Sequence, residues 1–336
     1  MSDHPDIASA RLEIAAEFRA FATRHAPATS TAYARWAAAI TEDDATLDRL
    51  ALLPIARRQP TLLLAAARWL GAEPGDVDDL SHLVRERWHD VAAVMATRLT
   101  QTNEIGRCGV LLPLLASLPQ PLALLEIGAS AGLCLLPDCF AYRWTAADGS
   151  SHALAPARPC PSTPLIETAI AGPVPLPTHL PEIVWRAGFD LAPVDLADDD
   201  AAAWLRNLVW PGDDDRAARL ASAIELARSS PDRPPVVAGD LRGELDDLRD
   251  LAAQAPPEAT LVVLHSAVLC YLDPAERTRV VGVVRDLPGH WISNEAAGVL
   301  GLGLAPSSTA DGAFVLALDG RPVARAHGHG RSLTWL

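Results

Sequence analysis

Lysine is absent from this chain of 336 residues, so all 28 side chains in its Lys+Arg total are arginine. This absence excludes several kinds of chemistry. A P-loop needs a lysine that binds phosphates, pyridoxal phosphate needs a lysine that forms a Schiff base, and a Ser–Lys dyad needs a lysine as its base. We therefore assign the protein to none of these classes.

Cysteine is scarce, and its positions are uninformative about metals or disulfides. The number is odd and no C-x-x-C pair occurs, so the sequence suggests neither a disulfide framework nor a zinc ribbon. The five are Cys108, Cys134, Cys139, Cys160 and Cys270. The N-terminal residues lack the pattern of a signal peptide, and no apolar run approaches the ~20 residues of a membrane span. We therefore expect a cytoplasmic protein with free thiols.

Positive charge is also in short supply, because the formal net charge is −14. A chain this acidic is a poor partner for nucleic acid or for anionic membrane surfaces. Hydrophobic residues make up 49% of the chain and charged residues 21%, which is typical of a globular protein. The expected partner is a small molecule or a protein, and composition leaves the oligomeric state open.

The stretch around which the chain is organised is LALLEIGASAGLCLL, residues 122–136. Its apolar, small-residue and apolar parts predict a buried strand ending at Glu126, a tight loop and the start of a helix. Gly128 and Gly132 suit a loop that holds a nucleotide-type ligand. GASAG also has the G-x-S-x-G pattern of a nucleophile elbow, with Ser130 at its tip. The third interpretation is an ordinary strand-to-helix turn.

The region 1–118 precedes this loop and is predicted to be helical, either as a separate domain or as a lid. Its unusual part is TQTNEIGRC, residues 100–108, where polar side chains fall on most faces. One interpretation is a helix end that reaches into a site and contacts a substrate through Gln101, Asn103, Glu104 and Arg107. The other is a capped junction with a Glu104–Arg107 pair on the surface.

The region 119–336 is predicted to be one α/β domain that contains an irregular, proline-rich insertion at 146–182. A strand that follows this insertion ends at Asp190. An acid at such a strand end binds ribose hydroxyls in dinucleotide folds, usually ~20 residues after the glycine loop. Asp190 lies much farther from Gly128, so this role requires the insertion. The alternative is a turn or cap residue.

Further strands alternate with helices and predict a parallel sheet, and Asp319-Gly320 predicts a hairpin near the C-terminus. In such sheets ligands bind in the crevice at the carboxyl ends of the strands. Polar residues that fall at predicted strand ends are Glu126, Asp190, Asp240, His265, Ser266, Asn294 and Glu295.

Several of these stretches resemble known families. LLEIGASAG, GFDLAP, VVAGDL and VVLHSAVLCYL resemble the binding motifs of class I S-adenosylmethionine-dependent methyltransferases. Nearly the whole chain resembles a bacterial family of unknown function, domain-of-unknown-function family 2332. The stretches that carry this second resemblance are TQTNEIGRC, LLEIGASAGL, RAGFDLAPVDL, WLRNLVWP, HSAVLCYL and WISNE.

The methyltransferase resemblance implies a Rossmann-like sheet of seven strands, closed by a C-terminal antiparallel hairpin, with S-adenosylmethionine as cofactor. Glu126, Gly128, Ser130 and Gly132 would surround its methionine part, and Asp190 would hold the ribose. Asp240 and Leu241 would meet the adenine, and His265 and Ser266 would face the methyl group. The N-terminal helices and the insertion would form the acceptor pocket, and Asn294 and Glu295 are further residues expected to bind the substrate.

His265 is the residue expected to act as a base if the acceptor loses a proton, because the pKa of histidine lies near neutrality. Its alternative role is a buried histidine that donates to a backbone carbonyl. His327 and His329 lie in a glycine-rich turn without a third ligand, so we expect no metal site there.

Two other functions remain open. A serine hydrolase would use Ser130 with Asp240 or Asp273 and with His290 or His327. Helices where a hydrolase has strands argue against it, as does the lack of an HGGG-type oxyanion loop. A binding protein without catalysis would hold a nucleoside ligand and transfer nothing.

Overall fold

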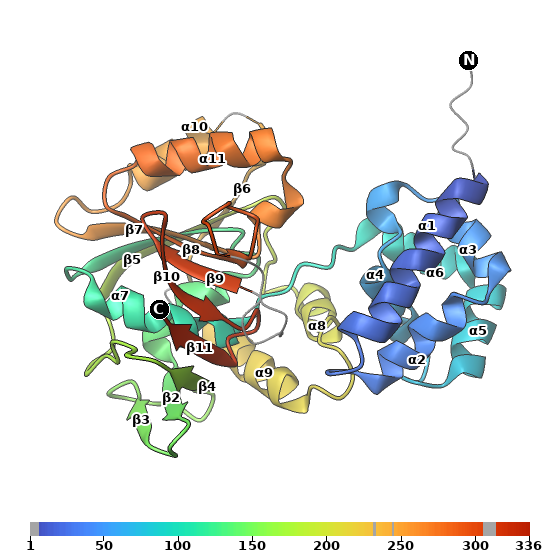
Figure 1. Cartoon of the computed structure of the whole chain (residues 1–336), viewed down its shortest axis with the longest axis horizontal. Helices are drawn as coiled ribbons and strands as arrows, with labels where there is room; N and C mark the ends of the chain where they lie inside the picture. The colour runs from blue at the N-terminus through green and yellow to red at the C-terminus, as the bar shows by residue number, and fades with distance from the viewer. Residues whose placement is uncertain (1–6, 231–232, 244, 305–313) are drawn as a thin grey trace. The chain divides into compact units, whose positions relative to one another are not determined.

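A computed structural model describes residues 7–230, 233–243, 245–304 and 314–336, and its ribbon is drawn in Figure 1. The chain forms two compact units. The first comprises residues up to Thr102 together with Ala203–Ala217, and the second comprises Asn103–Ala202 together with Ala218–Leu336.

The first unit is helical, as the sequence predicts for this region. Side chains at three helix starts accept backbone N–H groups: Ser30 from Tyr33, Asp43 from Thr46, and Asp76 from the first turn of its helix. The helices are α1 (Ile7–Ala20), which continues as a π-helix (Phe21–His25), α2 (Thr31–Ile40), α3 (Asp44–Ala51), α4 (Pro60–Trp69), α5 (Val77–Glu86) and α6 (Trp88–Thr97), with a short 3-10 helix at Ile55–Arg57.

A segment distant in sequence completes the core of this unit. Trp204 and Leu208 are buried in the same cluster as Phe18 and Trp36. The Trp204 indole donates to the Leu99 carbonyl at 2.8 Å. These residues lie in or just after α8 (Asp199–Asn207), which explains why 203–217 belongs with the N-terminal helices.

The helix α7 (Cys108–Ser117) belongs to the second unit, whereas the sequence predicts one helical region that includes all residues up to 118. Val110, Leu111 and Leu114 pack in one core cluster with Leu122 and Leu124. The apolar face of α7 therefore packs against the sheet.

The second unit contains a sheet that has eleven strands within the described ranges, so the predicted number of seven is wrong. Their order across the sheet is β3-β2-β4-β11-β10-β9-β8-β7-β1-β5-β6. The strands are β1 (Leu122–Ile127), β2 (Ala141–Ala146), β3 (Ser151–Leu154), β4 (Leu165–Ala171), β5 (Ile183–Asp190), β6 (Val236–Ala238), β7 (Thr260–Ser266), β8 (His290–Ala296), β9 (Phe314–Leu318), β10 (Arg321–Ala326) and β11 (Ser332–Trp335).

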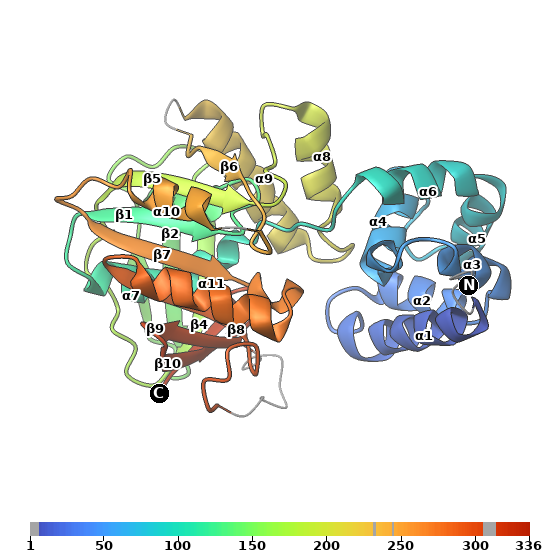
Figure 2. The ribbon, with the colours of Figure 1, turned by 90° about the horizontal axis from the view of Figure 1, so that it is seen from above.

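Five neighbouring strands, β6-β5-β1-β7-β8, are parallel, which confirms the predicted α/β alternation. The chain runs from β1 outward to β5 and β6, and then returns to the other side of β1 to form β7 and β8. Figures 1 and 2 show α10 (Asp246–Ala252) and α11 (Pro274–Asp286) over one face of this sheet, and α7 packs on the other face. The topological switch point therefore lies beside β1.

The other half of the sheet corrects the prediction for residues 146–182. The hairpin of β9 and β10 turns at Asp319-Gly320, both with positive φ, as the sequence predicts. However, the proline-rich insertion contains β3 and β4, and β4 pairs in parallel with β11. Ile166 and Thr168 alternate with exposed neighbours, so β4 has an ordinary half-buried pattern that the surrounding prolines obscured.

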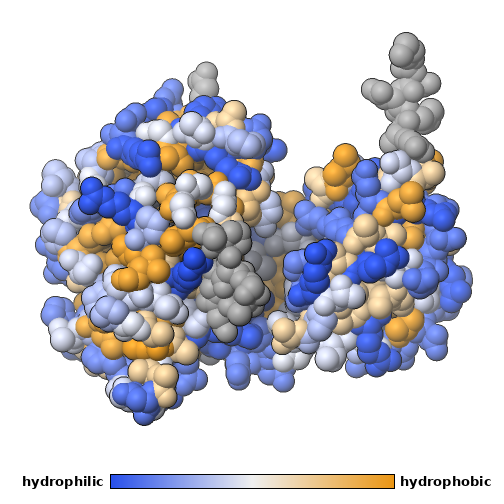
Figure 3. Space-filling view, in the orientation of Figure 1, coloured by the Kyte–Doolittle hydropathy of each residue, from blue (hydrophilic) through white to orange (hydrophobic). Residues whose placement is uncertain are grey.

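Hydrophilic and hydrophobic residues are interspersed over the face drawn in Figure 3. Among the residues that the structure describes, no helix has both the length and the apolar character that a membrane crossing requires.

Candidate functional site

The glycine loop after β1 is a tight turn with three residues in the left-handed region. The φ angles are +75° at Gly128, +52° at Ser130 and +73° at Gly132. Ser130 therefore adopts a conformation that favours glycine. The predicted helix after the loop is wrong. Two 3-10 turns, Leu133–Leu135 and Pro137–Cys139, follow instead, because a left-handed Gly132 and then a proline interrupt helical geometry.

Asp190 ends β5, as predicted, and its carboxylate holds the glycine loop. One oxygen accepts the Ser130 N–H at 2.8 Å, and the other accepts the Ala192 N–H at 2.8 Å. The Val194 N–H donates in turn to the Ser130 carbonyl at 3.0 Å. Asp190 is buried, so it contributes to the shape of the loop whatever it binds.

The TQTNEIGRC stretch contacts the exit of the same loop. The Asn103 side-chain oxygen accepts the Leu133 N–H at 2.8 Å, and the Glu104 carboxylate accepts the Gly106 N–H at 3.0 Å. Both side chains are buried, unlike the surface junction considered as an alternative. The Cys134 thiol donates to the Glu104 carbonyl at 3.5 Å. A hydrogen bond with Cys108, together with burial, raises the pKa of the Cys134 thiol.

Glu126 is the most unusual group beside the loop. Its side chain is 4% exposed, and its buried Oε2 meets no hydrogen-bond partner among the described residues. Burial raises the pKa of this carboxyl well above its ordinary value of 4.5. Cys134 and Asp190 raise this pKa further, whereas the Arg107 guanidinium opposes the change.

Arg107 joins the carboxyl end of β7 to a distant turn. Its guanidinium donates to the Ser266 carbonyl at 3.0 Å and to the Gly328 carbonyl at 2.9 Å. Ser266 also accepts a bond from the Asn294 amide at 2.9 Å, and the buried Asn294 Oδ1 has no partner among the described residues. By strand alternation, Glu126, Ser266 and Asn294 share the face that α7 covers.

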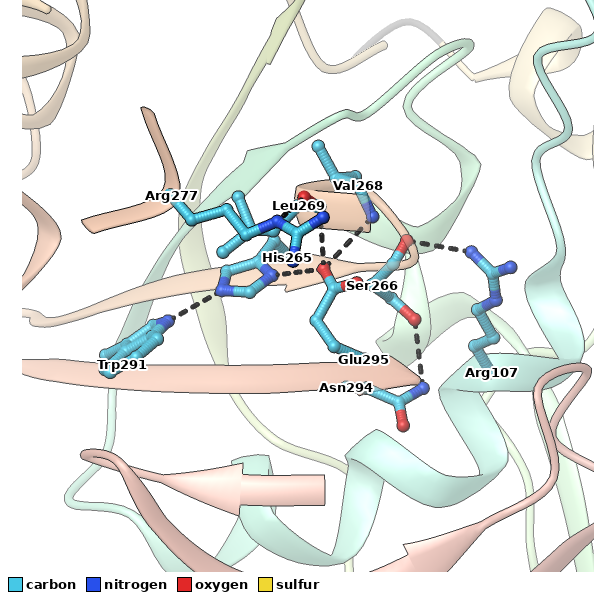
Figure 4. A network of polar contacts seen from close by, with 9 residues as sticks. All are labelled: Arg107, His265, Ser266, Val268, Leu269, Arg277, Trp291, Asn294 and Glu295. Carbon is cyan, nitrogen blue, oxygen red and sulfur yellow. Dashed lines mark hydrogen bonds and ion pairs between the residues drawn. The ribbon is translucent and has the colours of Figure 1, made fainter. Parts of the chain in front are cut away.

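His265 lies on the opposite face, in the network drawn in Figure 4. The Trp291 indole N–H donates to its Nε2 at 2.9 Å, so this nitrogen carries no proton. Nδ1 then carries the proton and donates to the Glu295 carboxylate at 2.7 Å. Both ring nitrogens are engaged in a residue that is 1% exposed. This geometry argues against His265 as a general base and makes it a buried histidine, whose acceptor is a carboxylate and not a backbone carbonyl.

Glu295 also fixes the loop that follows β7. Its Oε1 accepts the Val268 N–H at 3.0 Å and the Leu269 N–H at 3.1 Å. Ala267, just before, has φ +58°. The Val268 side chain then packs on the glycine loop, since a Cβ added at Gly128 would lie 2.1 Å from Val268 Cγ2.

Among the other predicted site residues, Gln101 belongs to the first unit, and two more lie outside these contacts. Asp240 follows β6, and its partly exposed carboxylate forms an ion pair with Arg242 at 2.8 Å, which holds its pKa below the usual range. Leu241 packs against the core cluster beneath α10 and α11.

The described residues do not assemble a hydrolase triad around Ser130. Its buried Oγ has no hydrogen-bond partner among them. His290 begins β8, at the amino end of the parallel strands and opposite to the glycine loop, and it bonds to Asp319 at 2.9 Å. Asp273 caps α11, and the His327 Nδ1 accepts the His329 N–H. Likewise, no group of three or more His, Cys, Asp or Glu within the described ranges is arranged to hold a metal ion.

A cavity of about 330 Å³ borders the loop on the side of β5 and β6. Gly132 is its only lining residue among those predicted from the sequence. The lining comprises Ala131, Gly132, Leu136, Pro193, Val194, Asp195, Leu196, Ala227, Arg233, Pro234 and Val236. Sequence reasoning also missed Val268 and Trp291, although Val268 lies within the motif HSAVLCYL.

The fold and site together define an α/β protein with a glycine loop and buried acids at the carboxyl ends of parallel strands. A family model described as an uncharacterized protein conserved in bacteria (DUF2332) matches residues 15–335. The chain belongs to this family. No curated protein matches it.

Proposed function

We propose that this protein binds S-adenosylmethionine at the carboxyl ends of β1, β5 and β7, and that it is a methyltransferase or a methyltransferase-like protein. Its acceptor would be a small molecule or a protein. The strand order supports this location, because open α/β sheets bind ligands where the direction of chain progression reverses.

The observation that carries the proposal is the buried carboxyl of Glu126. A buried carboxyl oxygen without a partner is costly, and the acid either stays neutral or pairs with a cation. S-adenosylmethionine carries two positive groups, the sulfonium and the ammonium. A ligand cation beside Glu126 would provide the partner that Oε2 lacks.

The loop fits such a ligand in part. Its left-handed residues allow close approach to the main chain, and Asp190 holds the turn in place. A carboxylate oxygen accepts more than one hydrogen bond, so ribose hydroxyls can add to the bonds that Asp190 already makes. The side chain of Val268 narrows the space above Gly128, and a ligand has to pass it.

S-adenosylmethionine, when bound, supplies an activated methyl group, and methyl transfer depends mainly on alignment of the acceptor. In this proposal Glu126 binds a cationic group, and the buried Asn294 Oδ1 and the Ser266 hydroxyl orient the acceptor. His265 keeps Glu295 and Trp291 in position and takes no proton.

Isothermal titration calorimetry with S-adenosylmethionine and S-adenosylhomocysteine tests the proposal. We expect Glu126→Gln to weaken binding about tenfold or more, because a charge-assisted contact is lost. Glu167→Gln is the matched control, since Glu167 is exposed on β4. If Glu126→Gln weakens the binding of both ligands, the ammonium faces Glu126. If it weakens the binding of S-adenosylmethionine alone, the sulfonium faces Glu126.

Absence of binding of either ligand to the unaltered protein would refute the proposal. Binding without methyl transfer to any acceptor would instead indicate a nucleoside-binding protein. Transfer from S-adenosylmethionine with a labelled methyl group, tried with small-molecule and protein acceptors, separates these two results.

A further inference from the structure

We infer that Val268 determines which ligands reach the glycine loop, and that Glu295 is the positioning residue that holds Val268 there. This inference rests on the proposed function, because it concerns the same site. Val268 lies far from the glycine loop in the sequence, and its side chain is apolar. Neither property would suggest a role in ligand selection.

The contact between Val268 and the loop is close. A Cβ added at Gly128 would lie 2.1 Å from Val268 Cγ2, 3.1 Å from Cγ1 and 3.2 Å from Cβ. The valine side chain therefore fills the volume that a larger residue at position 128 would need. The same volume lies between the carboxyl ends of β1 and β7, beside the switch point.

The backbone beneath Val268 is fixed from the neighbouring strand. Glu295 on β8 accepts the N–H groups of Val268 and Leu269, and it also accepts the Nδ1–H of His265. The Ala267 N–H donates to the Asn294 carbonyl at 3.1 Å. Since the backbone is anchored at three donors, the Val268 side chain has little freedom to retreat (Figure 4).

If the methionine part of a ligand lies against Gly128, the ligand must either displace the Val268 side chain or be narrow enough at this point to fit beside it. Overpacked contacts are unfavourable, so Val268 opposes wide groups at this point. Shortening Val268 should therefore strengthen binding, whereas lengthening it should weaken binding. A side chain that only stabilised the fold would not give opposite effects in the two directions.

The test is calorimetric titration with S-adenosylhomocysteine, which undergoes no methyl transfer. We expect Val268→Ala to bind about tenfold more tightly than the unaltered protein, and Val268→Ile to bind at least tenfold more weakly. Val281→Ala is the matched control, because it makes the same change at a half-buried position on α11 and should leave affinity unchanged.

The outcomes separate this inference from the proposed function. If the unaltered protein binds and all three variants match it, the role of Val268 is refuted and the proposed site stands. If the unaltered protein binds, Val268→Ala binds more tightly and Val268→Ile binds more weakly, both are supported. If neither the unaltered protein nor Val268→Ala binds, the proposed function fails and this inference fails with it.

A double-mutant cycle tests the part assigned to Glu295. Glu295→Ala releases the loop and should change affinity in the unaltered background but not in the Val268→Ala background. Glu295→Gln keeps an acceptor oxygen and should restore the original affinity. An equal effect of Glu295→Ala in both backgrounds would show that Glu295 does not act through Val268.

Discussion

Glu126 gives the sharpest test of the electrostatics at this site, because its carboxyl is buried and its pKa is raised. In the unfolded chain this group ionises near 4.5, whereas the native protein keeps its proton to higher pH. The native state therefore binds more protons than the unfolded state above that value. As pH rises, the contribution of Glu126 to the free energy of unfolding falls until the pKa of the folded state is passed.

The substitution Glu126→Gln removes this dependence. One retained proton changes the free energy of unfolding by up to about 1.4 kcal/mol per pH unit. The variant should therefore gain stability relative to the unaltered protein as the pH rises above about 5, for as long as the native Glu126 keeps its proton. Burying the amide of the Glu126→Gln variant has a free-energy cost that is the same at every pH, so it does not alter this pH dependence.

Urea unfolding followed by circular dichroism at several pH values measures the effect. Glu258→Gln provides the control, since its exposed side chain should give a difference that hardly changes with pH. If the difference between the unaltered protein and Glu126→Gln is constant with pH, Glu126 ionises as an ordinary acid and this reasoning is refuted. If a cationic ligand binds there, calorimetry in buffers of different ionisation enthalpy should detect a released proton.

Three other substitutions give distinct expectations for the free energy of unfolding. Ser130→Gly should raise it by about 1 kcal/mol, because glycine adopts the left-handed conformation at lower cost, and a decrease in urea midpoint would contradict this. Gly128→Ala should lower the free energy of unfolding by about 3 kcal/mol. The decrease should be smaller in a Val268→Ala background, because the clash with Val268 is then relieved, and equal decreases in the two backgrounds would contradict the contact. His265→Phe should lower it by about 3 kcal/mol, since the Trp291 N–H and a carboxylate oxygen lose a partner, and an unchanged midpoint would show that the network contributes little.

Much of the second unit follows from local patterns in the sequence. The strand ends at Asp190 and Ser266, the left-handed turn at Gly128 and the hairpin at Asp319-Gly320 were all predicted from short stretches. These features depend on alternation and turn chemistry within a few residues. The strand β4 escaped prediction because prolines on both sides suggested an irregular segment.

The role of His265 depends on strand register, which the sequence does not reveal. In the parallel pair of β7 and β8, His265 aligns with Ser293. Trp291 and Glu295 then lie two residues to either side, on the same face as the imidazole. A shift by one residue would have put both side chains on the other face. The hypothesis of a histidine base was reasonable from residue type, and only the pairing shows that both nitrogens are occupied.

Arg107 links the stretch before α7 to the proposed ligand site, and it gives a last prediction. Its guanidinium opposes the raised pKa of Glu126 while holding the carbonyls of Ser266 and Gly328. Arg107→Gln removes this positive charge, so the pKa of Glu126 should rise further. With Arg107 present, rising pH lowers the stability of the protein relative to Glu126→Gln over a limited pH interval. In the Arg107→Gln background, this interval should extend to higher pH. Urea unfolding of the four proteins of this cycle measures the extension. An interval that stays the same would mean that Arg107 acts on the β7 loop alone, and that the charge of the site is set by Glu126 and its acidic neighbours.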